Sequence, residues 1–247
     1  MKRILLTTVA LGALGLAAPA FAADLGPYTK APVLASPAYD WSGFYVGAFG
    51  GGGFGNHNLN NALGPAGFAN FTVNYTSSGA VAGGELGYNW QSGNIIFGIE
   101  GDYSWADING NDNFALGSND ATKLTGAATF RARGGIAVDR LLLFFTGGWA
   151  HGSLTHTNTD LGGGIGFGVD QFSVNRSGLT AGGGIAYALT NNLIGKLEYR
   201  YYDFGTYTRT GSPFTPNGQL PFNVANTYSV VTLGVDYKFG GPVVAKY

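Results

Sequence analysis

The last nine residues of the folded part of the chain, 231–239, alternate strictly between two kinds of side chain. In "VVTLGVDYKF", residues 230–239, apolar or aromatic residues occupy the odd positions from Val231 to Phe239. Polar or small residues, among them Asp236 and Lys238, occupy the even positions from Thr232 to Lys238. Because successive side chains of a strand point to opposite faces, this pattern predicts a β-strand with one apolar face and one polar face.

Stretches of this kind recur along the chain, and eight strands are predicted. They are Trp41–Gly53, Gly79–Gln91, Ile95–Ala106, Thr122–Val138, Leu141–Leu154, Phe172–Leu189, Leu193–Thr208 and Asn226–Phe239. Each is long enough for the roughly 9–11 tilted residues that cross a membrane. None of the nine prolines falls inside them, which is expected because proline cannot donate to a strand ladder.

The connections between these strands alternate between short and long. Residues 92–94, 139–140 and 190–192 have the composition of tight hairpin turns. The connections around residues 54–78, 107–121, 155–171 and 209–225 are long. Short periplasmic turns and long extracellular loops are typical of outer-membrane barrels, and an even strand number places both chain ends on the periplasmic side.

Composition indicates which solvent the apolar faces meet. Only 11% of the residues are charged, against about 25% in a soluble domain. Outside the N-terminus no apolar run reaches the ~18 residues of a spanning helix. A chain that cannot cover a water-exposed surface and has no spanning helix is expected to close into a barrel, with lipid outside and charges inside. The predicted fold is an all-β, eight-stranded antiparallel transmembrane β-barrel of the outer-membrane type.

Four segments are expected. Residues 1–22 have a basic start, an apolar core and a small-residue cleavage site, as in a secretory signal peptide. Residues 23–40 form a proline-rich periplasmic lead-in, residues 41–239 the barrel, and residues 240–247 a short periplasmic tail after a Gly-Gly-Pro stop. The net charge of −1 does not suggest a nucleic-acid partner. The absence of cysteine rules out disulfides and thiolate metal sites.

The first and last predicted strands carry a family resemblance. "WSGFYVGAFGGGGFG" (residues 41–55), the eight-strand layout and "LGVDYKF" (residues 233–239) resemble the alphaproteobacterial outer-membrane immunogenic protein family, within the OmpA-like eight-stranded barrels. The last strand also resembles the signal read by the barrel-assembly machinery, carried here by Gly234, Tyr237 and Phe239. In the usual signal the chain ends at the final aromatic residue, whereas here eight residues follow Phe239.

The polar faces of the strands predict the contents of the lumen. The residues expected inside are Glu85, Glu100, Asp102, Glu198 and Asp236 with Arg131, Arg133, Lys196, Arg200 and Lys238. An eight-stranded barrel is just wide enough to be filled by its side chains, and unpaired buried charge is costly. A structural ion-pair network that plugs the barrel is therefore expected, with a narrow polar pore as the alternative.

The four tryptophans are expected at the two membrane interfaces. On this topology Trp41 and Trp90 fall at periplasmic strand ends, and Trp105 and Trp149 toward the outer ends. Amphipathic aromatic residues gather at these levels in membrane barrels.

Three local patterns suggest chemistry but are better explained structurally. His151 and Ser153 have the spacing of a base and nucleophile in lipid A deacylases, yet no orienting acid is evident. His57, His151 and His156 fall in or near long loops, and some relatives of the resembled family bind haem. The glycine run 50–55 contains G-x-G-x-x-G without a following helix, so it is interpreted as barrel wall. No catalytic residue, cofactor or metal is expected.

The resulting expectation is a non-enzymatic structural and surface protein of the outer membrane of a Gram-negative cell. Its expected partners are outer-membrane lipid and lipopolysaccharide, the assembly machinery during insertion, and host or phage surfaces through the loops. The alternatives are a porin-like channel for small solutes and, less favoured, haem binding or a lipid A-modifying enzyme.

Overall fold

A computed structural model describes residues 39–61, 72–114, 118–161, 167–209 and 222–240. The expected signal peptide, residues 23–38 of the expected lead-in and residues 241–247 of the expected tail lie outside these ranges.

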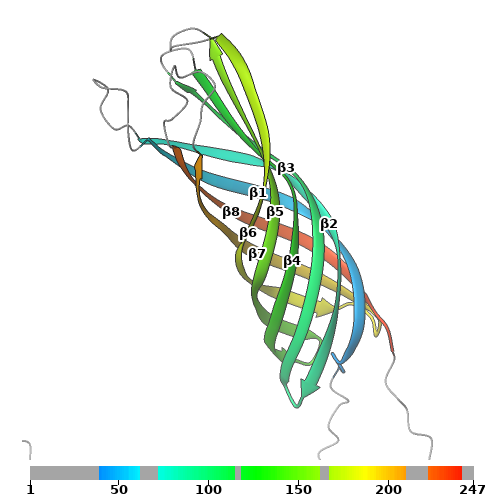
Figure 1. The fold of residues 1–247 in the computed structure, drawn as a ribbon. Coiled ribbons are helices and arrows are strands. Elements are labelled where there is room, and N and C mark those ends of the chain that lie inside the picture. The colour runs from blue at the N-terminus through cyan, green and yellow to red at the C-terminus, as the bar shows by residue number, and fades with distance from the viewer. Residues whose placement is uncertain (1–38, 62–71, 115–117, 162–166, 210–221, 241–247) are drawn as a thin grey trace, which may run out of the picture. The chain divides into compact units, whose positions relative to one another are not determined.

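The described residues form eight strands joined in chain order into one closed antiparallel barrel (Figure 1). The strands are β1 (Gly43–Asn61), β2 (Thr72–Ser92), β3 (Ile95–Phe114), β4 (Ser118–Val138), β5 (Leu141–Leu161), β6 (Phe167–Ala188), β7 (Leu193–Arg209) and β8 (Phe222–Lys238). Pairing of β1 with β8, from Tyr45–Lys238 to Asn61–Phe222, closes the barrel. The predicted fold is confirmed.

Most strands are longer than their sequence pattern indicates. Residues 54–61 and 72–78, expected in a loop, belong to β1 and β2, and residues 155–161 belong to β5. The sequence prediction therefore assigned to the long loops residues that belong to strands. The physical reason is that backbone pairing does not need an apolar face: polar side chains such as Asn58 and Asn74 bond across the strands, with 2.7 Å from Nδ2 to Oδ1.

The two ends of the barrel differ in how the strands are connected. At one end, which we call the turn end, β2–β3, β4–β5 and β6–β7 are joined by two to four residues. Gly93 has a φ of 63° and Asp139 a φ of 49°, the left-handed conformation that such tight turns need. The start of β1 and the end of β8 lie at the same end. The opposite end is called the loop end.

Alternation along the strands places one set of residues on the outer surface and the other set in the lumen. Leu233 on the outer face of β8 is 68% exposed, whereas its neighbour Thr232 is buried inside. The outer face of the barrel is apolar and aromatic throughout its middle, and buried charged residues lie within. No helix in the described part of the chain is long and apolar enough to cross a membrane.

Candidate functional site

The lumen is divided into three layers along the barrel axis, as the inward residues of β7 show. From the turn end they are Ile194, then Lys196, Glu198 and Arg200, then Tyr202. Ile194 belongs to a buried apolar layer with Trp41, Ile96, Ala137, Leu142, Phe144, Ala186 and Ala188. Tyr202 belongs to a second apolar layer with Phe49, Val81, Ile108, Leu124, Ala127, Ala150, Leu154, Phe204, Tyr228 and Val230. Charged residues fill the space between these layers.

Four acids and four bases of the described chain form one ion-pair network in the middle layer. They are Glu85, Glu100, Asp102 and Glu198 with Arg131, Arg133, Lys196 and Arg200. All were expected in the lumen from the alternation of their strands. Equal numbers of opposite charges remove the penalty that an excess charge would meet in a buried site.

Arg131 joins three of the carboxylates. Its Nη2 bonds Glu100 and lies 2.9 Å from Asp102 Oδ2, and its Nη1 lies 2.5 Å from Glu198 Oε1. The side chain is fully buried. Because an arginine fork presents several fixed donors, it can hold carboxylates from two different strands at once. Arg131 therefore ties β4 to β3 and to β7 across the lumen.

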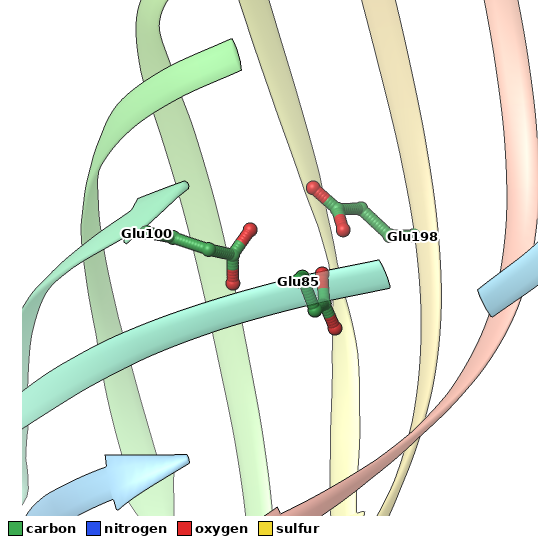
Figure 2. A group of neighbouring side chains, drawn as sticks. All are labelled: Glu85, Glu100 and Glu198. Atoms are coloured by element: carbon green, nitrogen blue, oxygen red, sulfur yellow. The ribbon is translucent and has the colours of Figure 1, made fainter. Parts of the chain in front are cut away.

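Lys196 lies among three glutamates on the other side of the network. The carboxylates of Glu85, Glu100 and Glu198 lie within 4.8 Å of one another (Figure 2), a spacing that could hold a cation. The Lys196 ammonium bonds Glu85 and lies 3.7 Å from Glu100 and 3.5 Å from Glu198. It thus supplies the positive charge that this trio needs.

Two arginines connect the charged layer to the apolar layers. The Arg133 guanidinium lies 3.9 Å from the ring centre of Phe144 in the turn-end layer. The Arg200 guanidinium lies 4.6 Å from the ring centre of Phe49 in the loop-end layer. Cation–π contacts of this kind are strongest where water is excluded, so the three layers pack as one continuous plug.

Sequence reasoning missed the uncharged members of the network. Tyr45 donates to Glu100 Oε2 at 2.6 Å and accepts from Arg133 Nη1 at 3.0 Å. Thr129 bonds Asp102, and Thr146 accepts from Arg131 at 3.0 Å. Their inward position follows from strand alternation, but hydroxyls and phenols carry no charge signal that would single them out.

Asp236 and Lys238 differ from the expectation that they join the network. Asp236 is buried, but it takes part in no ion pair among the described residues and one carboxylate oxygen has no hydrogen-bond partner. It packs over Gly47, where a Cβ would come 2.0 Å from Oδ1. Lys238 lies at the rim, where its ammonium bonds the backbone oxygen of Asp40 and lies 4.5 Å from the Tyr39 ring centre. The turn-end apolar layer separates Lys238 from the other charges.

Trp41 also differs from its expected place at the lipid interface. It is 1% exposed and lies in the turn-end apolar layer, with its Nε1 donating to the Asp139 backbone oxygen at 3.3 Å. Trp41 precedes β1, so strand alternation does not determine its direction, and the open end of the lumen accommodates its ring. Tyr39 packs edge-on against it at 4.9 Å and donates to Asn191 O at 3.0 Å. Burial raises the pKa of Tyr39 to about 12.

The other three tryptophans lie on the outer surface. Trp90 is exposed near the turn end, and Trp105 and Trp149 are exposed toward the loop end. The residues of the expected assembly signal also separate by face. Tyr237 and Phe239 are exposed and pack edge-on at 5.1 Å, while Gly234 faces the lumen beside Lys196. Their role in assembly stays a prediction.

The histidines are held by protein partners. His57 has both ring nitrogens in hydrogen bonds, 2.7 Å to Asn226 Oδ1 and 2.9 Å to Ser77 Oγ. His156 Nδ1 lies 2.9 Å from Thr122 Oγ1. Iron ligation by His57 would require breaking one of these bonds, so the geometry gives no support to a haem site there.

The His151–Ser153 pair does not have the geometry of a base and its nucleophile. His151 Nδ1 lies 3.1 Å from Ser177 Oγ, and Ser153 Oγ donates to Asn175 Oδ1 at 3.0 Å. Both side chains are bonded across to β6 instead of to each other. These contacts belong to a row of polar side-chain pairs between β5 and β6 on the loop side of Trp149. The Trp149 ring stacks on that of His151, with 5.6 Å between the ring centres.

A closed barrel with an apolar outer belt and an enclosed charged layer is a transmembrane β-barrel. Residues 8–239 match the family model described as outer membrane protein beta-barrel domain, and the chain belongs to this family. It is an outer-membrane protein, as its curated relatives are.

Among those relatives is the 25 kDa outer-membrane immunogenic protein of Brucella abortus, 30% identical over 97% of this chain and 99% of the relative. The 22 kDa outer membrane protein of Rhizobium leguminosarum is 31% identical over 71% of this chain and 69% of the relative. The expected family resemblance is confirmed. The crystal structure of OprG from Pseudomonas aeruginosa shares the fold, with a TM-score of 0.51 and 13% identity over 81% of this chain and 97% of that one.

Proposed function

We propose that this protein is a non-enzymatic, structural and surface component of the outer membrane whose lumen is closed to solutes. The observation that carries the proposal is the three-layered plug. A solute crossing the barrel would have to displace two apolar layers as well as the ion-pair network between them. A pore-forming barrel instead needs a continuous polar path.

Energetics also favours a fixed plug. Arg131 and Lys196 are fully buried, and each contacts three carboxylates. Removing one partner from such a buried network costs about 3–5 kcal/mol. Thermal exchange among ion pairs would therefore open a conducting path only rarely.

The orientation of the barrel in the membrane is inferred from the general plan of outer-membrane barrels, which have short periplasmic turns and long extracellular loops. The turn end, with the start of β1 and the end of β8, would face the periplasm, and the loop end the exterior. Outer-membrane lipid and lipopolysaccharide would then meet the outer belt, and the assembly machinery would contact β8 during insertion. The loop end would be available to host or phage surfaces.

Planar-bilayer recording tests the closed lumen. The purified protein, shown to be folded by a difference in gel mobility between unheated and boiled samples, is added to a bilayer beside a general porin as positive control. We expect no steady conductance from this protein and clear steps from the porin.

Steady, ion-selective steps that scale with the amount of this protein would overturn the proposal and establish the porin-like alternative. A variant of the plug, Arg131→Ala combined with Phe49→Ala and Phe144→Ala, provides the matched comparison. It removes a side chain from each of the three layers. Currents in the variant alone would show that the plug closes the lumen of the native protein.

A further inference from the structure

The barrel does not remain closed up to the loop end. Pairing between β2 and β3 stops at Ser78–Asn109, and pairing between β6 and β7 stops at Leu179–Asp203. All other neighbouring strands stay paired far beyond these levels, to Asn61–Phe222 between β1 and β8 for example. Within the described residues the sheet is therefore split along two seams, which lie four strands apart on opposite sides of the barrel.

The seams divide the loop end into two four-stranded sheets, which we call jaws. The first jaw comprises the loop-end parts of β7, β8, β1 and β2, and the second comprises those of β3, β4, β5 and β6. Figure 1 shows them diverging: the ends of β3 to β6 run one way, and the cyan, blue and orange ends of β2, β1 and β8 another.

Both seams contain the same types of residue at equivalent places. At the first, a Cβ on Gly79 would lie 1.8 Å from the Asp107 backbone oxygen; at the second, a Cβ on Gly178 would lie 2.0 Å from that of Asp203. Each aspartate is followed by a buried apolar residue of the loop-end layer, Ile108 or Phe204. The backbones of the two strands thus approach at a glycine next to the last pair: Gly79 lies one residue before it and Gly178 one residue beyond it.

A β-bulge accompanies each seam. The pairing of β3 with β4 shifts between Trp105 and Ile108, and that of β7 with β8 between Asp203 and Thr206. At the second bulge Gly205 has a φ of 69°, and its backbone N–H donates to Asp203 Oδ1 at 2.8 Å. Bulges bend a strand and terminate pairing on one side, so each turns its strand away from the preceding one.

The repetition extends to the sequence. "SGAVAGGELGY" at residues 78–88 and "SGLTAGGGIAY" at residues 177–187 share Ser-Gly, Ala-Gly-Gly and the final Tyr in the same places. The apolar residues that follow the two aspartates are equivalent too: Ile108 packs over Gly53 and Phe204 over Gly152. A seam that occurs twice with the same construction is a built feature of the barrel and not an irregularity of one strand.

At each seam a polar side-chain contact, which we call a latch, joins the two jaws in addition to the packing of Ile108 and Phe204. The hydroxyls of Tyr75 on β2 and Thr122 on β4 are 2.6 Å apart, and Arg176 Nη2 on β6 donates to Thr206 O on β7 at 3.0 Å. Such contacts are far weaker than a backbone ladder. Opening the jaws would break these latches and part Ile108 from Gly53 and Phe204 from Gly152. It would leave the ion-pair network, the turn-end apolar layer and all pairing below the seams intact.

We propose that the loop end is a two-jawed clamp that opens along these two seams, with the paired Gly–Asp contacts as hinges. Opening uncovers the inner surface between the jaws, where His57 stacks on Tyr75 at 4.7 Å and meets Tyr228 edge-on at 5.4 Å. The clamp goes beyond the closed lumen. Its hinges lie at the level of the loop-end apolar layer, so the ion-pair network and the turn-end apolar layer still close the lumen when the jaws part.

Distance measurement between spin labels tests the clamp, and the absence of native cysteine makes the labelling specific. Thr76→Cys with Gln171→Cys places one label on each jaw, and Thr76→Cys with Thr208→Cys places both on the first jaw. All three side chains are exposed. Combining Tyr75→Phe with Arg176→Ala removes both latches. We expect the distance between jaws to lengthen by about one strand spacing, ~5 Å, and its distribution to widen, while the distance within the first jaw stays the same.

Tyr199→Phe is the matched control, since it removes a hydroxyl contact of 3.0 Å to Ser229 that crosses no seam. It should change neither distance. An unchanged distance between jaws in the latch variant, or an equal change within the first jaw, would overturn the clamp. If the latch variant fails to fold, the native protein decides: on warming, a distribution between jaws no wider than that within the first jaw also overturns it.

Discussion

At the scale of single residues, position inside the barrel determines what a charge contributes. Arg131 is fully buried and contacts three carboxylates, whereas Lys123 pairs with Asp107 at 2.7 Å on the exposed surface. The exposed pair is screened by water and salt, and it gains little. The buried arginine compensates carboxylates that cannot reach solvent.

Replacing Arg131 with methionine is therefore expected to lower the free energy of unfolding by about 3–5 kcal/mol. Lys123→Met, the control, should leave it unchanged. Urea unfolding of the protein in lipid vesicles, followed by gel mobility and tryptophan fluorescence, measures both. Equal unfolding midpoints for the two variants would contradict a stabilising network.

At the scale of the elements, glycine shapes β1 on one face only. A Cβ on inward-facing Gly51 would lie 1.9 Å from the Val231 backbone oxygen of β8. On outward-facing Gly50, the nearest atom would be the Val81 oxygen at 3.8 Å. The close approach of β1 and β8 therefore requires glycine at the inner position, whereas the outer one has room for a methyl group.

Gly51→Ala should therefore destabilise the barrel by about 1–3 kcal/mol, the usual cost of overpacking. Gly50→Ala should be neutral or slightly stabilising, because alanine loses less backbone entropy on folding. The yield of heat-modifiable protein after refolding, together with the urea midpoint, compares the two. Comparable losses for both variants would show that the inner contact does not limit closure of the barrel.

At the scale of the whole molecule, the inverted arrangement of faces is the property that lipid requires. Leu233 is exposed in the apolar belt beside Leu197 and Gly50 of the adjoining strands. Asn58, also outward, lies farther along β1 among polar side chains. A charge at the first position would meet hydrocarbon, and at the second a polar environment.

Leu233→Arg is accordingly expected to cost about 2–4 kcal/mol in lipid vesicles, and Asn58→Arg to cost little. The difference in stability between the two variants should be smaller in short-chain detergent micelles, because detergent can rearrange around the arginine. Unfolding measured in both media gives the comparison. A Leu233→Arg variant as stable in vesicles as the native protein would place the hydrocarbon belt elsewhere.

Much of the fold was determined by the sequence alone, for a physical reason. A strand has a side-chain period of two, so alternation over residues such as Leu197, Glu198 and Tyr199 specifies both the element and its two faces. With few charges in total, only lipid outside and charge inside satisfies these faces. The eight strands, the closed barrel and the placement of the eight network residues follow from that periodicity.

Only the tertiary structure decided what periodicity does not encode. Trp41 lies before β1, and its burial depends on the space left at the turn end. Lys238 has inward parity but is kept from the network by the apolar layer above it. Pairing partners across the barrel, such as Arg131 with Glu198, and the two seams at Gly79 and Gly178 arise from contacts between residues distant in the chain. Such contacts depend on how strands coil around one lumen, which no local pattern specifies.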